Sequence, residues 1–184
     1  MSFGEAIKSV FSKYAVFSGR ARRSEYWYFA LFYFLVGLAL DCIPFLNFLS
    51  FIWILAMLIP SITVSVRRLH DIGKSGWNFL IVAIPQLLLI GYLVYIFFLV
   101  FIDLTEADIN FYNLSDNLEV AIDIIKNSFK ANTSSLATLG IIGIIDFAAT
   151  ILWLVWMTRD SQPGENQWGP NPKEVSNNNN SGMN

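Results

Sequence analysis

The sequence is poor in cysteine and histidine, with one of each, Cys42 and His70. A single thiol cannot form an internal disulfide or supply the paired cysteines of a CxxC metal site. A lone histidine with no cysteine or second histidine nearby makes a poor metal ligand set. We interpret Cys42 as a small apolar filler, and we expect no metal and no cofactor.

Charged residues are scarce as well, and the basic residues do not outnumber the acidic ones. Charged residues make up 14% of the chain, against about 25% in ordinary soluble domains. The formal net charge is -2, which argues against a nucleic-acid-binding protein, because such a protein needs a basic face over much of its chain. Hydrophobic residues make up 55%. This is the composition of a membrane protein.

Four apolar runs approach the roughly 20 residues that a helix needs to cross a bilayer. They cover about 26–45, 48–66, 79–102 and 136–157. The first run is too long and too aromatic for an export signal and has no small-residue cleavage site, so we expect the N-terminus to be retained. The sequence predicts an all-α, polytopic membrane protein with a four-helix transmembrane domain at 20–158.

Basic residues give an orientation, because Lys and Arg flanking short loops are retained on the cytoplasmic side. With both termini cytoplasmic, every Lys and Arg except Lys126 and Lys130 falls inside, and the acidic loop 103–135 falls outside. Indole rings prefer the membrane interface. The tryptophans at the predicted cytoplasmic ends are Trp27, Trp77, Trp153 and Trp156. We therefore predict a multi-pass protein with both ends inside.

Three further segments lie outside the predicted spans. Apolar residues recur at helical spacing within 1–19, which predicts an amphipathic helix that lies on the inner leaflet or packs on the protein's own loops. The outer loop contains the same spacing at Leu118, Ala121, Ile122 and Ile125, which predicts one helix there. The tail, 159–184, is rich in Gly, Pro and Asn, and we expect it to be irregular and disordered after about residue 173.

The stretch RRLHDIGKSGW, residues 67–77, contains an unusual number of charged and polar residues for this apolar chain. A phosphate-binding loop is excluded, because Arg68 stands where the pattern needs its first glycine. An acid-base pair of His70 and Asp71 is also disfavoured, since neighbouring residues on a helix do not face one another. No catalytic residue is predicted, and we expect no enzyme.

A membrane turn explains most of this stretch. The second span continues as helix through the arginines, Gly73 ends it, Ser75 caps the next helix, and Trp77 marks where the chain enters the lipid again.

A second hypothesis is that this turn also binds a ligand, because guanidinium groups match the geometry of phosphate oxygens. Arg67, Arg68 and Lys74 would then form a pocket for a phosphate or an anionic headgroup. The stretch GRARRSEYW, residues 19–27, has a similar construction. The candidate residues for binding a headgroup or a protein partner are Arg20, Arg23, Arg67, Arg68, His70, Asp71, Lys74 and Trp77. The partner would be the lipid bilayer, another membrane protein or a second copy of the chain.

Two acids, Asp41 and Asp146, lie within apolar runs. An ionised carboxylate at the centre of a bilayer costs about 2.5 to 3.5 kcal/mol. Each acid shares a helix face with small residues, so we expect these faces to meet and turn both acids inward as a possible ion or proton site. The alternative is that both lie near the outer interface and hydrogen-bond there.

Three motifs carry a resemblance to a known family: FSGRARRSEYWYFALF, RRLHDIGKSGWNFL and GENQWGPNP. Together they resemble the small bacterial inner-membrane proteins grouped as domain of unknown function 805, the YhaH/YhaI-like type, over about 14–172. The outer loop is longer than the resemblance implies. The resemblance implies an integral protein of the bacterial inner membrane and no established activity.

Two function classes stay open. The first is a non-enzymatic membrane protein that binds headgroups or a partner through its cytoplasmic motifs. The second is a small oligomeric carrier or channel built around Asp41 and Asp146.

Overall fold

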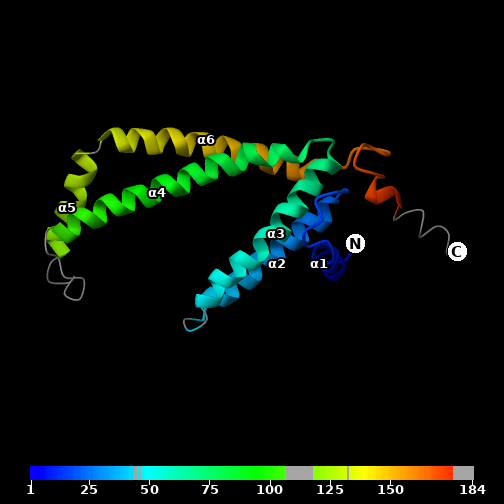
Figure 1. Ribbon diagram of the computed structural model, residues 1–184, viewed down its shortest axis with the longest axis horizontal. Coiled ribbons are helices and arrows are strands. Elements are labelled where there is room, and N and C mark those ends of the chain that lie inside the picture. The colour runs from blue at the N-terminus through cyan, green and yellow to red at the C-terminus, as the bar shows by residue number, and fades with distance from the viewer. Residues whose placement is uncertain (44, 46, 107–117, 132, 176–184) are drawn as a thin grey trace. The chain divides into compact units, whose positions relative to one another are not determined.

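The computed structural model describes residues 1–43, 45, 47–106, 118–131 and 133–175. These ranges are helical and contain no strand, so the predicted all-α class is confirmed. The elements, shown in Figure 1, are α1 (Phe3–Ser12), α2 (Arg23–Asp41), α3 (Asn47–Asp71), the short 3-10 helix η2 (Gly76–Phe79), α4 (Leu80–Glu106), α5 (Leu118–Ala131) and α6 (Thr133–Thr158). The expected disorder of the last residues falls on 176–184, which lie outside the described residues.

The chain divides into two compact units. The first consists of residues 1–79 and 153–184, and therefore holds α1, α2, α3, η2, the last turns of α6 and the tail. The second consists of residues 80–152, with α4, α5 and most of α6.

Helix α1 begins with a capping box. The Glu5 amide donates to Ser2 Oγ, and the Glu5 carboxylate accepts from the Ser2 amide at 2.7 Å, which satisfies two free donors of the first turn. Val10 is fully buried, and the Phe11 ring meets Phe29 of α2 edge-on. The apolar stripe of this segment is therefore used partly against the protein's own α2.

Helices α2 and α3 pack side by side as an antiparallel pair (Figure 1). Trp53 of α3 stacks on Tyr33 of α2, with ring centroids 6.1 Å apart, and its indole Nε1 donates to the Tyr33 carbonyl oxygen at 3.3 Å. Met57 and Val64 of α3 are buried in the core of this unit.

The turn after α3 has the geometry that the sequence predicts. Gly73 has a φ of 75°, and the Lys74 amide donates to the Leu69 carbonyl oxygen at 2.9 Å, so the helix ends in a left-handed cap. The Trp77 amide then donates to Ser75 Oγ at 3.4 Å as η2 begins. A Cβ on residue 73 would lie 2.6 Å from the Gln162 side-chain oxygen, so this flexible side chain would have to move.

In the second unit, α4 and α5 pack together through Leu104, which contacts Val100 and Ile124. Helix α5 occupies the segment where the apolar spacing predicts a helix. The Tyr92 hydroxyl of α4 donates to the Ser135 carbonyl oxygen near the start of α6 at 2.9 Å.

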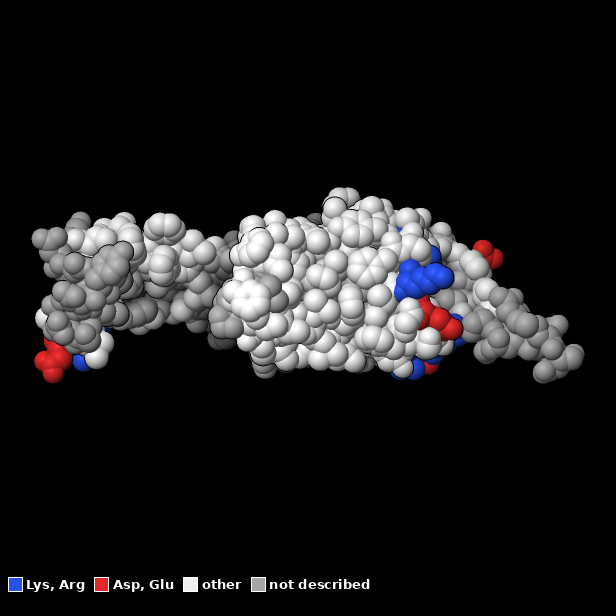
Figure 2. Space-filling view, turned by 90° about the horizontal axis from the view of Figure 1, so that it is seen from below, with Lys and Arg blue, Asp and Glu red and all other residues white. Residues whose placement is uncertain are grey.

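Within the described residues, three stretches are long and apolar enough to cross a membrane: Phe48–Asp71, Gly76–Thr105 and Ser134–Thr158. They correspond to the second, third and fourth predicted spans. The predicted first span lies mainly in α2, whose 19 residues include Arg23, Glu25 and Asp41, and α2 is not among the three. The count of four spans therefore stays a prediction. Figure 2 shows a face on which uncharged residues cover most of the surface and charged atoms form a few small groups.

Candidate functional site

The centre of the candidate site is the carboxylate of Asp71, the last residue of α3. Arg20 Nε donates to its Oδ1 at 3.1 Å, and Arg68 Nη1 donates to its Oδ2 at 2.5 Å. The Ser161 hydroxyl, from the tail, donates to Oδ2 at 2.6 Å. The side chains of Asp71 and both arginines are at most 1% exposed. One carboxylate thus joins three segments that are far apart in the sequence.

Arg20 also holds the tail in place. Its Nη1 donates to the carbonyl oxygens of Gly164 at 2.8 Å and Gly169 at 3.2 Å. Its Nη2 donates to the carbonyl oxygens of Gln162 at 2.6 Å and Asp71 at 3.4 Å. Every N–H direction of the guanidinium is therefore used. The tail has the irregular backbone that its composition predicts. The hydrogen bonds from Arg20 to three of its carbonyl oxygens fix the conformation of that backbone.

Arg68 caps the C-terminal end of α6. Its Nη2 donates to the Met157 carbonyl oxygen at 3.3 Å and also to that of Arg159, and its Nε donates to Met157 at 3.4 Å. The last carbonyl groups of a helix have no partner within the helix. Arg68 supplies donors to them while it pairs with Asp71.

A second buried pair lies beside the first. Arg67 Nη1 donates to Glu25 Oε1 at 2.7 Å, and the Ser9 hydroxyl of α1 donates to the same oxygen at 3.1 Å. The Arg67 and Glu25 side chains are 1% and 4% exposed. Arg67 Nε and Nη2 have no acceptor among the described residues.

His70 connects the turn to the tail by stacking. Its ring lies parallel to the Trp168 indole, with centroids 4.5 Å apart and planes 7° apart. His70 Nδ1 is 3.1 Å from the Gly19 carbonyl oxygen, which only accepts, so Nδ1 carries the proton in this contact. The Asn166 amide group donates to the His70 carbonyl oxygen at 3.0 Å. His70 and Asp71 therefore serve different partners, as neighbouring helix residues do.

We call the buried side chains Arg20, Glu25, Arg67, Arg68, His70 and Asp71 the motif network. Its geometry corrects one expectation: the pocket predicted from Arg67, Arg68 and Lys74 is not formed, because both arginines are 0% exposed and face carboxylates of the protein. Arg20 and Asp71 are buried in contact with each other, and His70 is buried against the Trp168 ring.

The other predicted binding residues lie nearer the surface. Trp77 is 79% exposed. The Lys74 amine lies 4.5 Å from the centre of the Trp156 ring. Arg23 Nη2 is 3.8 Å from the Asp160 carboxylate, and its side chain is 46% exposed.

Glu25 of the network was not among the predicted candidates, nor were three residues that contact the network, Ser161, Asn166 and Trp168. The structure pairs Glu25 with Arg67, 42 residues further along the chain. The available signal was that the motifs contain two acids, Glu25 and Asp71, beside their arginines.

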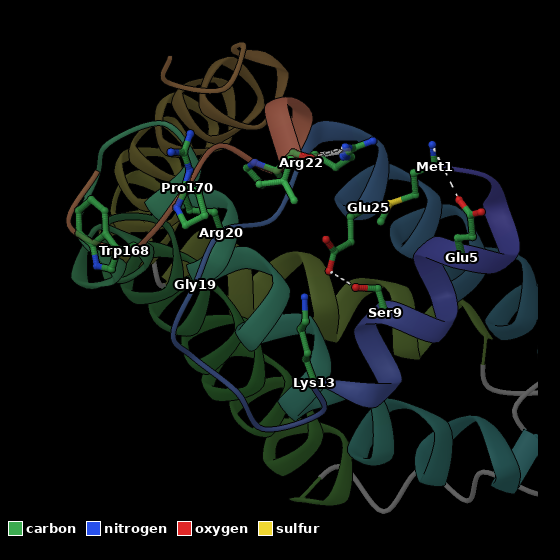
Figure 3. Close-up of a pocket in the computed structure, with 12 residues that line it drawn as sticks. Met1, Glu5, Ser9, Lys13, Gly19, Arg20, Arg22, Glu25, Trp168 and Pro170 are labelled. Atoms are coloured by element: carbon green, nitrogen blue, oxygen red, sulfur yellow. Dashed lines mark hydrogen bonds and ion pairs between the residues drawn. The ribbon is translucent and has the colours of Figure 1, made fainter. Parts of the chain in front are cut away.

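A pocket of about 640 Å³ opens beside the motif network (Figure 3). Its wall combines α1, the segment before α2 and the tail. Its lining includes Glu5, Ser9, Lys13, Arg22, Glu25 and Trp168. Figure 3 shows the side chains of Lys13 and Glu25 extending into the pocket from different elements.

The family model described as "Protein of unknown function (DUF805)" matches residues 14–113, more than half of the chain. The chain belongs to the DUF805 family. The match contains the 19–27 and 67–77 motifs of the network and ends before the tail.

Two relatives of this DUF805 protein come from Escherichia coli (strain K12). Inner membrane protein YhaI is 40% identical over 95 residues, which cover 49% of this chain and 78% of the relative. Inner membrane protein YhaH is 37% identical over 98 residues, which cover 48% of this chain and 78% of the relative. No solved structure matches the chain significantly. The DUF805 protein is thus a helical transmembrane protein of an inner-membrane family whose function is unknown.

The two acids within apolar runs of this DUF805 protein differ in their surroundings. Asp41 is exposed, and its Oδ1 accepts from the Ser50 hydroxyl at 2.5 Å. Asp146 is half-buried in the second unit, and its Oδ1 has no hydrogen-bond partner among the described residues. The expected meeting of their two helix faces stays a prediction.

No group of three or more His, Cys, Asp or Glu residues lies together within the part of the chain that the structure describes.

Proposed function

We propose that this protein is a non-enzymatic component of the inner membrane that binds an anionic lipid headgroup in the pocket beside α1. The charge balance of the motif network carries the proposal. Its buried cations outnumber its buried carboxylates. The cations are Arg20, Arg67 and Arg68, and the carboxylates are Asp71 and Glu25. An uncompensated buried charge is costly, so a bound anion beside the network would stabilise it.

The pocket wall supplies cations of its own. Lys13 reaches into the pocket from the end of α1, and Arg22 lies at its rim, where its Nη2 donates to the Pro172 carbonyl oxygen at 2.6 Å. Ammonium and guanidinium groups are strong donors to phosphate oxygens. Lys13 and Arg22 therefore take the ligand-facing role that the sequence suggested for Arg67 and Arg68.

Helix α1 would bring the pocket to the headgroup layer. Phe3 and Phe11 are 41% and 37% exposed, and Lys8 is exposed on the same helix. A helix with exposed aromatic and basic side chains lies well at an anionic membrane surface. In the proposed orientation, with both termini cytoplasmic, this surface is the inner leaflet of the membrane.

Native mass spectrometry of protein taken from nanodiscs tests the proposal, with phosphatidylglycerol as the anionic lipid and phosphatidylcholine as the neutral one. We expect retained phosphatidylglycerol in the wild type and less in Lys13→Gln. Arg22→Gln is the second variant, and it also breaks the bond to Pro172. Lys126→Gln is the matched control, because Lys126 is an exposed cation on α5.

Three outcomes would contradict the proposal. These are equal retention of phosphatidylglycerol in wild type and Lys13→Gln, an equal loss in Lys126→Gln, and a co-purifying protein or second copy of the chain in place of lipid.

A second candidate function is a small carrier or channel, and it draws on Asp146. A carboxylate oxygen without a hydrogen-bond partner on an apolar helix is a candidate proton or ion site. Proton flux into reconstituted vesicles would fall in Asp146→Asn at equal protein content. Unchanged flux in both Asp146→Asn and Asp41→Asn would remove this candidate.

A further inference from the structure

A second, smaller pocket lies at the end of the α2–α3 pair that is remote from the motif network. Its volume is about 230 Å³, below the roughly 300 to 1,000 Å³ of sites for drug-sized ligands. It is lined by α2 and α3 side chains, among them Tyr33, Gly37, Asp41, Ser50 and Trp53. The pocket therefore has room for a small chemical group.

The polar end of this pocket is a carboxylate held in place by a hydroxyl. The Ser50 hydroxyl donates to Asp41 Oδ1 at 2.5 Å, which fixes the carboxylate with its second oxygen unengaged by any described side chain. Asp41 is in no ion pair among the described residues. The lining includes no Lys or Arg. The pocket therefore favours a cation over an anion.

The remaining wall is aromatic and rigid. Trp53 is fixed by stacking on Tyr33 and by the hydrogen bond from its Nε1 to the Tyr33 carbonyl oxygen. Gly37 lies beside the indole, because a Cβ at this position would be 3.8 Å from Trp53 Nε1, in ordinary van der Waals contact. Aromatic rings attract cations through their negative faces, and the attraction grows as water is excluded.

These features select among cations. A calcium ion takes six to eight oxygen ligands, whereas the side chains that line the pocket offer one carboxylate, Asp41, and the hydroxyls of Ser50 and Tyr33. A primary ammonium needs only a few acceptors for its N–H groups and an apolar surface for its carbon chain. We infer that the Asp41 pocket binds a primary ammonium group, with Asp41 and Ser50 as acceptors and Trp53 as the apolar wall.

A primary ammonium could reach this pocket as the headgroup of phosphatidylethanolamine or as a free amine. Native mass spectrometry separates the two sources. One arm uses nanodiscs with phosphatidylethanolamine or with phosphatidylcholine, whose quaternary ammonium has no N–H donor. The other arm adds free ethanolamine to protein in phosphatidylcholine nanodiscs.

We expect the wild type to retain phosphatidylethanolamine or ethanolamine, and Asp41→Asn to retain about fivefold less, the scale of a partly exposed ion pair. Asp123→Asn is the matched control, because Asp123 is an exposed carboxylate on α5. Trp53→Phe, which keeps an aromatic wall but loses the indole, should give a smaller loss. Unfolding temperatures of the variants show whether each is folded.

The inference would be overturned if wild type and folded Asp41→Asn retained equal amounts of phosphatidylethanolamine and of ethanolamine. It would also be overturned if the wild type retained phosphatidylethanolamine and phosphatidylcholine equally and bound no ethanolamine. The result is separable from the proposed function, because Lys13→Gln should leave ammonium retention unchanged and Asp41→Asn should leave phosphatidylglycerol retention unchanged.

Discussion

At one end of the α2–α3 pair, charged side chains are buried and joined to each other, and at the other end a single carboxylate is exposed and bonded to a serine. The first end holds Asp71, Arg68 and Arg20 in contact, all nearly inaccessible to water. The second holds Asp41 and Ser50. The same two helices therefore carry two kinds of polar site.

The difference lies in what covers each end. Segments from outside the pair cover the buried end: the residues before α2, and the tail, in which Ser161 lies 90 residues after Asp71. Burying a charge pair costs desolvation energy that the attraction often only offsets. We infer that the motif network fixes which segments meet, more than it adds net stability.

The largest expected effect in this comparison is that of Asp71→Asn. Removing this charge leaves Arg20 and Arg68 buried without their carboxylate, which should lower the free energy of unfolding by about 3 to 5 kcal/mol. Asp41→Asn, at the exposed end, should cost about 1 kcal/mol or less. Equilibrium unfolding in detergent compares the two variants. Equal losses would contradict the distinction between the two ends.

The helices and the turn at Gly73 could be predicted because their signals are local: apolar runs, helical spacing and a glycine after the last helical residue. The identity of the motifs could also be predicted. The way the motifs pack against one another could not be predicted. A run of arginines has the same sequence whether its side chains face water or pair with a carboxylate of the protein. The partners of Arg67 and Arg20 lie 42 and 51 residues away, and no local pattern specifies such pairing.

A smaller effect is expected from Gly73→Ala. The φ of 75° at this position should cost a side chain about 1 to 2 kcal/mol, and the flexible Gln162 side chain would have to turn away from the new Cβ. Gly140→Ala is the control, because a Cβ there meets nothing within 4 Å. Unfolding temperatures should fall for the first variant and hold or rise for the second. The reverse order would refute the proposed role of the turn.

Trp168→Ala should have the next effect, through loss of the stack on His70. Such aromatic pairs are worth about 0.5 to 1.5 kcal/mol beyond the area they bury. The tail should loosen, so hydrogen exchange at the Gln162 amide, which donates to the Asp71 carbonyl oxygen at 2.8 Å, should speed up. Trp77→Ala removes a tryptophan that is 79% exposed and should leave that amide protected.

The smallest effect concerns pH and the exposed Asp160. The Lys173 amine and the Ser161 amide hold the pKa of this carboxyl below its ordinary value of 3.8. A lowered pKa in the folded state stabilises the fold above the unfolded pKa, and this contribution is lost as the pH falls through the folded pKa. The unfolding temperature of wild type should slightly exceed that of Asp160→Asn at neutral pH and converge with it in acid. A difference that grows in acid would contradict this sign.

The central claim is that Arg20 and Asp71 interact directly and so join the first motif to the second. A double-mutant cycle of Arg20→Gln and Asp71→Asn, read as free energies of unfolding, tests it most directly. The structure predicts a coupling energy of at least about 1 kcal/mol, because residues in one ion-pair network are not additive. Additive effects, within about 0.5 kcal/mol, would show that the two side chains do not meet.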